Sequence, residues 1–374
     1  MTDAIFTSAT TWLLLAQAGV APPVAAPVAP ASTAGGMRLD LRTLILLGTV
    51  LGLLAAASII GRVLRRSADT TLNPAMVKTF RSRVNAWWTM YAILIAGFLV
   101  DFAFRYVFRA TIATVVLFGL VSFWALREYI TMTPTRRGDH RTLFWTFFLF
   151  TPLQYVLVGI GSYCFELYTT MIPVYASLFI PARIAISGDP KRFLERVAKI
   201  QAGLLICVYA LSHAPALLSL QLHYSNGQPW VIDAQGTSGS NAGLLFFFVL
   251  LVQLNDVFQY VWGQLLGKHV IAEQINSSKT WEGVIGGLMS SMILSMLLCW
   301  ATPFSLWEAP CIALVVSLAG FAGTMTMSAV KRDRGVSDYG TLVQGHAGVL
   351  DRIDSICFAA PVFFHITRYF FSKL

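Results

Sequence analysis

The chain has 374 residues, of which 56% are hydrophobic and 12% are charged, with a mean hydropathy of +0.66. A water-soluble domain of this size cannot bury so much apolar surface, so the composition excludes a soluble globular protein and indicates a polytopic membrane protein. The formal net charge of +9 does not indicate nucleic-acid binding, because the basic residues are spread over short segments between apolar runs.

Residues 1–41 precede the first long apolar run and are expected to form an external N-terminal segment. Ala21 to Gly36 is rich in Ala and Pro, which is typical of a flexible, partly polyproline tether. The apolar piece Trp12 to Leu15 lacks the basic region that precedes a signal-peptide core, although Ala16-Gln-Ala18 resembles a cleavage site. Removal or retention of this segment is left open.

Ten apolar runs are long enough to cross about 30 Å of hydrocarbon, which takes roughly 20 residues. They predict an all-α polytopic membrane protein with about six spans in an N-terminal region, residues 42–235, and about four spans in a C-terminal region, residues 236–374. The predicted spans are residues 42–62, 84–105, 109–126, 142–160, 165–186, 200–220, 242–264, 283–303, 308–329 and 352–371.

The distribution of Lys and Arg predicts the orientation of these spans. If the connection 63–83 is cytoplasmic, alternation places the connections 127–141, 187–199, 265–282 and 330–351 on the same side. Of the 27 basic residues, 21 then fall on or next to the cytoplasmic side. The six on the other side are Arg38, Arg42, Arg105, Arg109, Arg368 and Lys373. This asymmetry predicts that both termini face outward.

Three cytoplasmic segments carry the candidate functional residues, and the first is the end of the seventh span. Asp256 lies inside an apolar run, where a carboxylate is unfavourable by a few kcal/mol unless it is paired or faces water. It is therefore either a functional residue or the buried partner of an arginine. Gly263 and Gly267, like Gly283, Gly286 and Gly287 in the next span, indicate close helix packing.

The second segment leads into the eighth span. We expect Asn276, Ser277 or Ser278 to cap that helix, whose first N–H groups and positive dipole end favour an anion. Lys279 beside them would strengthen a phosphate site. The alternative is an ordinary capped helix start with a lysine that reaches toward the membrane surface.

The third segment, residues 328–355, is the most densely charged part of the chain. Asp351 and Asp354 are three residues apart at a predicted helix start, so their carboxylates share one face. Two carboxylates on one face suit Mg²⁺, which binds carboxylates together with substrate phosphates and water. The alternative is that acids simply favour a helix N-terminus.

The loop before Asp351 has the residues of a polyphosphate site. Lys331 and Arg332 end the ninth span, and Asp338 follows. Glycines at 340, 345 and 348 allow tight backbone turns that present N–H groups to an anion. His346, between Gly345 and Gly348, is interpreted as a functional rather than a structural histidine. No Walker A sequence and no dinucleotide-binding glycine pattern is present.

At these residues the chain resembles the phosphatidate cytidylyltransferase (CDP-diacylglycerol synthase) family. The C-terminal pattern of that family is matched by Ser328, Lys331, Arg332, Asp338, Gly340, Gly345, His346, Gly348, Leu350, Asp351, Arg352, Asp354 and Ser355. Its upstream pattern is matched by Asp256, Tyr260, Gly263, Lys279, Thr280, Glu282 and Gly283. The resemblance covers roughly residues 240–360. Four family positions differ: Thr324 replaces an acid, Ser337 a lysine, Gln344 a proline and Ala347 a glycine.

The resemblance implies a metal-dependent reaction of CTP with phosphatidic acid that yields CDP-diacylglycerol and pyrophosphate. It implies catalytic roles for Lys331, Arg332, Asp338, His346, Asp351, Arg352 and Asp354. It implies substrate-binding roles for Asp256, Lys279, Thr280, Glu282, Ser328, Gly345 and Gly348. Asp351, Asp354 and Asp338 would hold Mg²⁺, with room for a second metal ion. A homodimer in the lipid bilayer is a further expectation from the family.

Two alternatives to this function remain. Thr324 and Ser337 leave open another CTP-dependent lipid enzyme, such as a polyprenol kinase or a cytidylyltransferase for a different lipid phosphate. A transporter or a non-catalytic scaffold is the other alternative. Transporters concentrate their charges and broken helices at the midplane, often within inverted repeats. The charges here instead cluster at one predicted interface, which argues against transport.

Overall fold

The computed structural model describes residues 41–67, 74–103, 111–132, 135–225, 227–230, 240–336 and 348–372. All of these residues belong to one compact unit, residues 37–374. Apart from Leu41, the predicted external segment lies outside the described residues.

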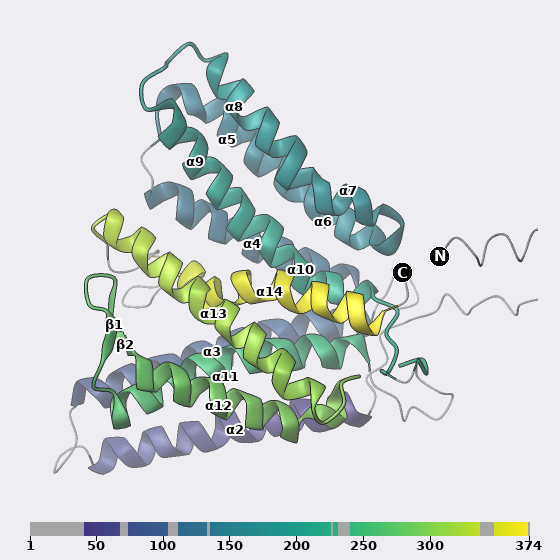
Figure 1. The fold of residues 1–374 in the computed structure, drawn as a ribbon, viewed down its shortest axis with the longest axis vertical. Coiled ribbons are helices and arrows are strands. Elements are labelled where there is room, and N and C mark those ends of the chain that lie inside the picture. The colour runs from purple at the N-terminus through teal and green to yellow at the C-terminus, as the bar shows by residue number, and fades with distance from the viewer. Residues whose placement is uncertain are drawn as a thin grey trace, which may run out of the picture. The chain divides into compact units, whose positions relative to one another are not determined.

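Helices dominate the fold, because an apolar segment in hydrocarbon must satisfy its backbone N–H and C=O groups within itself. The long helices are α2 (Leu41–Ser67), α3 (Pro74–Ala103), α4 (Ile112–Met132), α11 (Asn241–Leu266), α12 (Trp281–Leu297), α13 (Glu308–Asp333) and α14 (Leu350–Phe371) (Figure 1). Helix α3 begins ten residues before the predicted second span, with a polar stretch that hydropathy does not detect.

Three further helical segments consist of short pieces joined end to end. The first comprises η1 (Arg137–Asp139), α5 (His140–Trp145), η2 (Thr146–Phe150) and α6 (Thr151–Ile160). The second comprises η3 (Gly161–Cys164), α7 (Phe165–Thr170), η4 (Met171–Ala176) and α8 (Ser177–Ala185). The third comprises α9 (Phe193–Leu204), η5 (Leu205–Ala210), α10 (Leu211–Ala216) and η6 (Leu217–Ser219). A short 3-10 turn, η7 (Cys299–Ala301), follows α12.

Each predicted span coincides with one helical segment of the described chain. Five helices there are long and apolar enough to cross a membrane: Ile112–Met132, Arg137–Ile160, Phe193–Ser219, Asn241–Leu266 and Glu308–Asp333. Three shorter apolar helices are Arg42–Ala56, Tyr91–Asp101 and Trp281–Leu297. The helical fold is confirmed, and the crossing of all ten segments stays a prediction.

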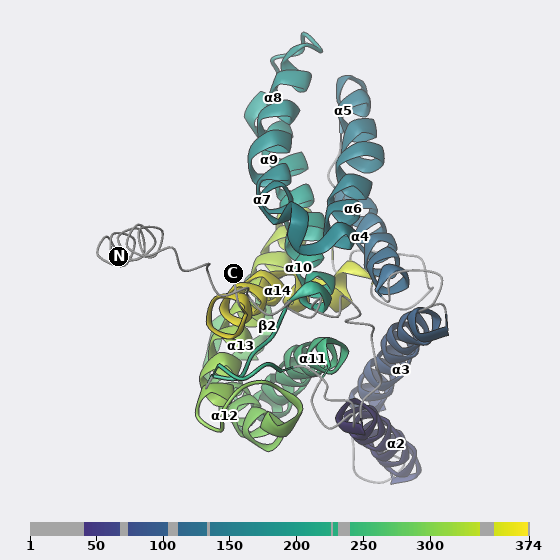
Figure 2. The same cartoon turned by 90° about the vertical axis from the view of Figure 1, so that its right-hand side faces the viewer.

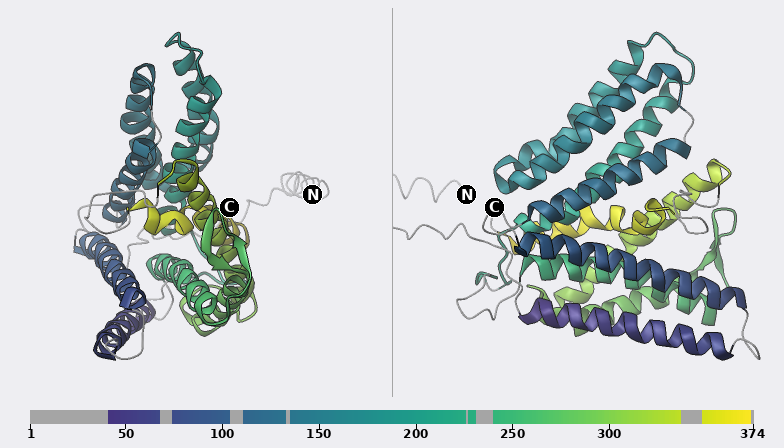
Figure 3. Two further views of the ribbon diagram at one scale, coloured as in Figure 1. Left: turned by 90° about the vertical axis from the view of Figure 1, so that its left-hand side faces the viewer. Right: turned by 180° about the vertical axis from the view of Figure 1, so that it is seen from behind.

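A small hairpin departs from the predicted all-α fold. Strands β1 (Val270–Ala272) and β2 (Asn276–Thr280) pair antiparallel, with Val270 opposite Thr280 and Ala272 opposite Asn276. The sequence Asn-Ser-Ser-Lys-Thr of β2 is short and polar, so it carries no alternation of apolar residues that would predict a strand. The hairpin lies beside the end of α13 (Figure 3, right).

Helix α14 lies between two groups of helices and packs against both. It contacts α11 and α13 on one side and α4, η5 and α10 on the other (Figures 1 and 2). Phe248 of α11 and Phe363 of α14 are fully buried and stack with their ring centroids 4.9 Å apart. This aromatic core fixes α14 against the C-terminal helices.

Candidate functional site

The first pair of candidate residues, Asp256 and Lys279, is brought together by α11 and β2. The Lys279 Nζ atom lies 3.3 Å from Oδ1 of Asp256 and donates a 2.7 Å hydrogen bond to Oε1 of Gln259. The side chain of Lys279 is 11% exposed. Asp256 is therefore paired with a candidate site lysine, and the alternative of a buried arginine partner is wrong for the described residues.

Close packing of α11 on α12 makes this pairing possible. A Cβ atom added at Gly283 would lie 2.6 Å from the carbonyl oxygen of Gln259, and one added at Gly287 would lie 2.4 Å from Cγ of Gln259. Any larger residue at either position would push the two helices apart. The predicted packing role of these glycines is confirmed, and it places Gln259 within reach of Lys279.

Thr280 and Glu282 join the hairpin to α12. Thr280 is the N-cap residue, and its Oγ1 accepts a 3.1 Å hydrogen bond from the Gly283 N–H. The predicted caps Asn276, Ser277 and Ser278 are therefore wrong, because these residues are in β2 and the helix starts later. Glu282 accepts hydrogen bonds from the backbone N–H groups of Lys268 and His269 at 3.1 and 3.2 Å.

The second pair, Lys331 and Asp351, joins the end of α13 to the start of α14. The Lys331 Nζ atom donates to Oδ1 of Asp351 at 2.8 Å, and the Gly348 N–H donates to Oδ2 at 3.1 Å. The side chain of Asp351 is 6% exposed. Lys331, Gly348 and Asp351 therefore form one connected group at the N-terminus of α14.

Asp354 lies one turn further along α14 and is 7% exposed. Its Oδ1 accepts a 2.7 Å hydrogen bond from the Ser355 N–H. Asp351 and Asp354 therefore both lie in the first turns of α14, and their joint role stays a prediction.

Gly323 lets α13 approach α14 at Asp354. A Cβ atom added at Gly323 would lie 2.7 Å from the Asp354 carbonyl oxygen. The neighbouring Thr324, which stands at the family's acidic position, donates a 3.3 Å hydrogen bond to the Gly320 carbonyl of its own helix. Its hydroxyl therefore bonds the backbone of α13.

Two contacts hold the hairpin against α13. Asn276 Nδ2 donates to Oγ of Ser328 at 3.1 Å, and Arg332 Nε donates to the Ile275 carbonyl at 3.2 Å. The candidates Ser328 and Arg332 thus contact the hairpin. The remaining candidate of α14, Arg352, is fixed through its backbone, since its carbonyl accepts a 3.0 Å hydrogen bond from Gln253 Nε2.

The predicted residues Asp338, Gly340, Gly345 and His346 lie outside the described residues. So do three of the four family departures, Ser337, Gln344 and Ala347. Their predicted roles stay predictions.

The described acids have the chemistry for Mg²⁺. No group of three His, Cys, Asp or Glu side chains that could hold a metal ion is found in the described part of the chain. Mg²⁺, however, is commonly bound by one or two carboxylates together with substrate phosphates and water. Asp351 and Asp354, one turn apart on α14, provide such a pair of carboxylates.

Three polar residues of this region were not predicted from the sequence, and a fourth, Asn276, was predicted in another role. Gln259 follows Asp256 at helical spacing, so its position on the same face was a usable signal. Asn276 was considered only as a cap, and Gln253 gives no sequence signal. Glu128 of α4, whose carboxylate accepts the Val349 and Leu350 N–H groups at 3.1 and 2.9 Å, also gives none.

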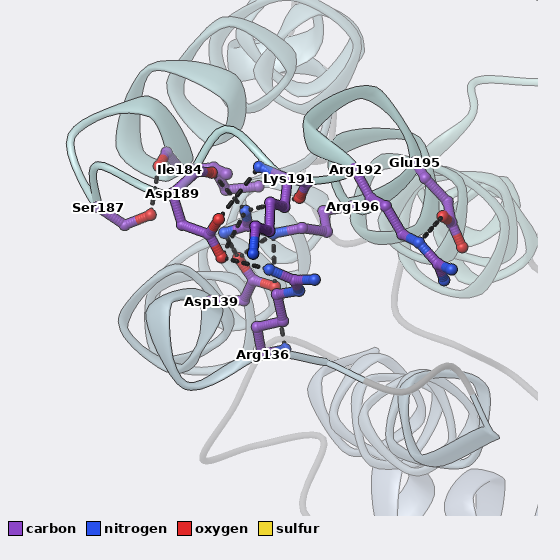
Figure 4. Close-up of polar contacts among 9 residues, drawn as sticks. All are labelled: Arg136, Asp139, Ile184, Ser187, Asp189, Lys191, Arg192, Glu195 and Arg196. Atoms are coloured by element: carbon purple, nitrogen blue, oxygen red, sulfur yellow. Dashed lines mark hydrogen bonds and ion pairs between the residues drawn. The ribbon is translucent and has the colours of Figure 1, made fainter.

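A second polar cluster joins the α4–α5 and α8–α9 connections (Figure 4). Arg196, with a side chain 5% exposed, donates from Nε to both carboxylate oxygens of Asp139 at 2.9 and 3.0 Å, and from Nη1 to the Asp189 carbonyl at 2.7 Å. Arg136 donates to Oδ2 of Asp189 at 2.7 Å, and this bond lowers the pKa of Asp189 below its ordinary value. In the sequence, both arginines indicated only the orientation of the membrane spans.

The fold and the site together define a helical protein of the membrane class with paired acids and lysines gathered at helix ends. The sequence pattern of the cytidylyltransferase family matches residues 82–370. The chain therefore belongs to this family of nucleotidyltransferases.

Individual relatives differ in how much of the chain they match. An uncharacterized protein of Escherichia coli K12, YnbB, is 36% identical over 330 residues, which cover 86% of this chain and 97% of the relative. The phosphatidate cytidylyltransferases of Staphylococcus saprophyticus and Staphylococcus haemolyticus are 38% and 37% identical over 120 residues. That match covers 32% of this chain and 46% of each enzyme, so it spans less than half of their length.

Proposed function

We propose that the protein is a phosphatidate cytidylyltransferase, which converts CTP and phosphatidic acid into CDP-diacylglycerol and pyrophosphate. The observation that carries this proposal is that the hairpin joins two lysine–carboxylate pairs, Lys279 with Asp256 and Lys331 with Asp351: β2 carries Lys279, and Asn276 of the same strand bonds Ser328 of α13. Cations and carboxylates in one environment are what a reaction between two phosphate-bearing substrates requires.

The reaction is a displacement at phosphorus. A phosphate oxygen of phosphatidic acid attacks the α-phosphorus of CTP and forms the new P–O bond. The bond between the α-phosphorus and the oxygen bridging to the β-phosphorus breaks, and pyrophosphate leaves with that electron pair. A phosphomonoester has its second pKa near about 6, so the attacking dianion is abundant at neutral pH and no strong general base is needed.

The residues of the site act by position and charge. Lys279 and Lys331 neutralise phosphate oxygens of the two substrates, assisted by Arg332 and Arg352. His346 donates a hydrogen bond to a phosphate oxygen. Thr280, Glu282, Ser328, Gly345 and Gly348 shape the substrate site. The site would hold the attacking phosphate oxygen in line with the bond that breaks in CTP. The two substrates then need not find this geometry by chance, so the entropic part of the barrier is lower.

Asp351 and Asp354 would hold Mg²⁺, with Asp338 and Asp256 assisting. The ion would offset the negative charge that accumulates on the transferred phosphoryl group and on pyrophosphate. The lysines of the cluster are already paired with Asp256 and Asp351, and Asp354 adds a further acid. Because the carboxylates offset the lysines, the site has little positive charge left for two polyanionic substrates. This supports the binding of a divalent cation.

The site would lie at the cytoplasmic surface of a bacterial inner membrane. There it would meet water-soluble CTP from one side and the head group of phosphatidic acid from the other. The excess of Lys and Arg on the predicted cytoplasmic side supports this orientation.

The decisive experiment uses the full-length protein purified in detergent. We expect wild type to release pyrophosphate from CTP only with both Mg²⁺ and phosphatidic acid present. Asp351→Asn and Lys331→Ala should each lower this rate by about 100-fold, because each removes a charge that stabilises the transition state. Variants that match wild type would refute the site assignment.

A parallel series with other lipid phosphates tests the substrate. Turnover of polyprenyl phosphate or another lipid phosphate, but not phosphatidic acid, would replace the proposed substrate and keep the cytidylyl transfer. Release of CDP instead of pyrophosphate would identify a lipid kinase. Lack of turnover with every lipid would refute the enzymatic function.

A further inference from the structure

The N-terminus of α14 has no capping side chain in its own N-cap residue. That residue is Val349, which has no polar side-chain atom, and no side-chain capping hydrogen bond is made. The first N–H groups of any helix lack partners within the helix, and a buried one must find a partner elsewhere.

Glu128, from the other group of helices, supplies that partner. Its two carboxylate oxygens accept the N–H groups of Val349 and Leu350, at 3.1 and 2.9 Å. The Glu128 residue is 3% exposed. The buried carboxylate is stabilised here by the N–H groups and by the positive end of the α14 dipole.

Asp351 completes the same helix end. Its Oδ2 accepts the Gly348 N–H, so Glu128 and Asp351 together satisfy three consecutive backbone donors. A helix N-terminus filled by two protein carboxylates does not offer these N–H groups to a substrate phosphate. Helix α14 would then contribute to the reaction by positioning the carboxylates of Asp351 and Asp354.

We infer that Glu128 is a positioning residue: α4 holds the N-terminus of α14 and thereby sets the place of the Asp351 and Asp354 carboxylates. This inference rests on the proposed function for its effect on catalysis. It gives the N-terminal helices a part in the reaction, because α4 fixes the start of the helix that carries the two acids.

The test compares Glu128→Gln with a matched control, Asp101→Asn. Asp101 of α3 is 4% exposed and caps α4 in the same manner, accepting the Ala113 and Thr114 N–H groups at 2.6 and 2.9 Å. Both changes keep the size of the side chain and remove one carboxylate from a helix N-terminus. The control helix end carries none of the candidate site residues.

Catalysis gives the first readout. Glu128→Gln should raise the Mg²⁺ concentration at half-maximal rate by about 10- to 100-fold, the usual effect of losing a group that orients metal ligands. Asp101→Asn should leave that concentration within about twofold of wild type, even where both variants lose similar thermal stability. Glu128→Asp keeps the charge, but its shorter side chain moves the carboxylate away from the Val349 and Leu350 N–H groups. Its Mg²⁺ concentration at half-maximal rate should lie between the values of wild type and Glu128→Gln.

Amide hydrogen exchange gives a second readout that needs no activity. In wild type the Val349 and Leu350 amides should exchange slowly, and in Glu128→Gln about tenfold faster. If Glu128→Gln does not fold, slow exchange at these two amides in wild type and an intermediate rate in Glu128→Asp carry the test. Fast exchange in wild type would overturn the inference.

The two proposals fail differently. If wild type uses no lipid phosphate, the proposed function is wrong, and exchange still decides whether Glu128 holds α14. If wild type is active and Glu128→Gln has the same Mg²⁺ dependence as Asp101→Asn, Glu128 is only structural and the inference is wrong.

Discussion

Each lysine of the candidate site is held by a carboxylate of the same site. Lys279 bonds Asp256 and Gln259, and Lys331 bonds Asp351. These bonds order two long side chains before a substrate arrives, so less rotamer entropy is lost when phosphate binds. The partners also lower the net charge that the lysines present. In the proposed reaction, two polyanionic substrates would then need an additional cation, which is the role proposed for Mg²⁺.

Removing the Lys279 ammonium should weaken binding of CTP. In Lys279→Met we expect the KM for CTP to rise by about tenfold, because one charge-assisted contact to a phosphate is worth about 1.4 kcal/mol. Steady-state rates at varied CTP measure this effect. Lys268→Met is the matched control, since Lys268 is an exposed lysine of the same connection. Equal KM values in the two variants would contradict a role for Lys279 in CTP binding.

At the element scale, the buried pair of Arg196 and Asp139 ties the α8–α9 connection to the start of α5. Removing one partner leaves an uncompensated buried charge, which typically costs about 3–5 kcal/mol. We expect Arg196→Met and Asp139→Leu each to destabilise the protein by about this amount. Unfolding in detergent, followed by circular dichroism, measures the change.

The double variant separates charge from packing. Arg196→Met combined with Asp139→Leu leaves no unpaired charge, so it should be more stable than either single variant. Strictly additive losses in the double variant would contradict this account. Cytidylyl transfer per folded molecule should be unchanged in all three, because neither residue belongs to the candidate site.

The sequence predicted the helices of this fold better than their ends. Long apolar runs identify a buried helix without any knowledge of its neighbours. The cap Thr280 and the hairpin were missed, because each depends on polar residues that have no regular spacing.

The site was predictable to the extent that it is local. Asp351 and Asp354 share a helix face because of their spacing. The pairing of Lys279 with Asp256 was not predicted, because it depends on the hairpin that brings β2 beside α11. Glu128 bonds a residue 222 positions away, and an isolated glutamate near a helix end carries no sign of such a contact. Glu128 and Leu350 come together only because α14 packs between two groups of helices.

At the scale of the whole molecule, the helix ends form two sets. In the contacts described, ends on the predicted cytoplasmic side contact one another, and ends on the predicted outer side contact one another. The predicted cytoplasmic connections meet through Arg136 with Asp189, Glu195 with Arg334, Arg332 with Ile275 and Glu128 with Leu350. The predicted outer ends meet through Thr43 with Ser240, Arg42 with Trp300 and Leu222 with Ser372. Helices that alternate in direction produce this separation.

Cysteine labelling tests whether the first set faces the cytoplasm. In a variant with all five native cysteines replaced, single cysteines at Lys191 and Glu273 lie in exposed connections of the first set, and one at Gln221 lies in the second. In right-side-out spheroplasts, a membrane-impermeant maleimide should label Gln221→Cys at once, and Lys191→Cys and Glu273→Cys only after permeabilisation. The excess of Lys and Arg in the first set is the physical reason, since positively charged connections are retained inside. The opposite pattern would place the acids and lysines of the site away from CTP and would contradict the proposed function.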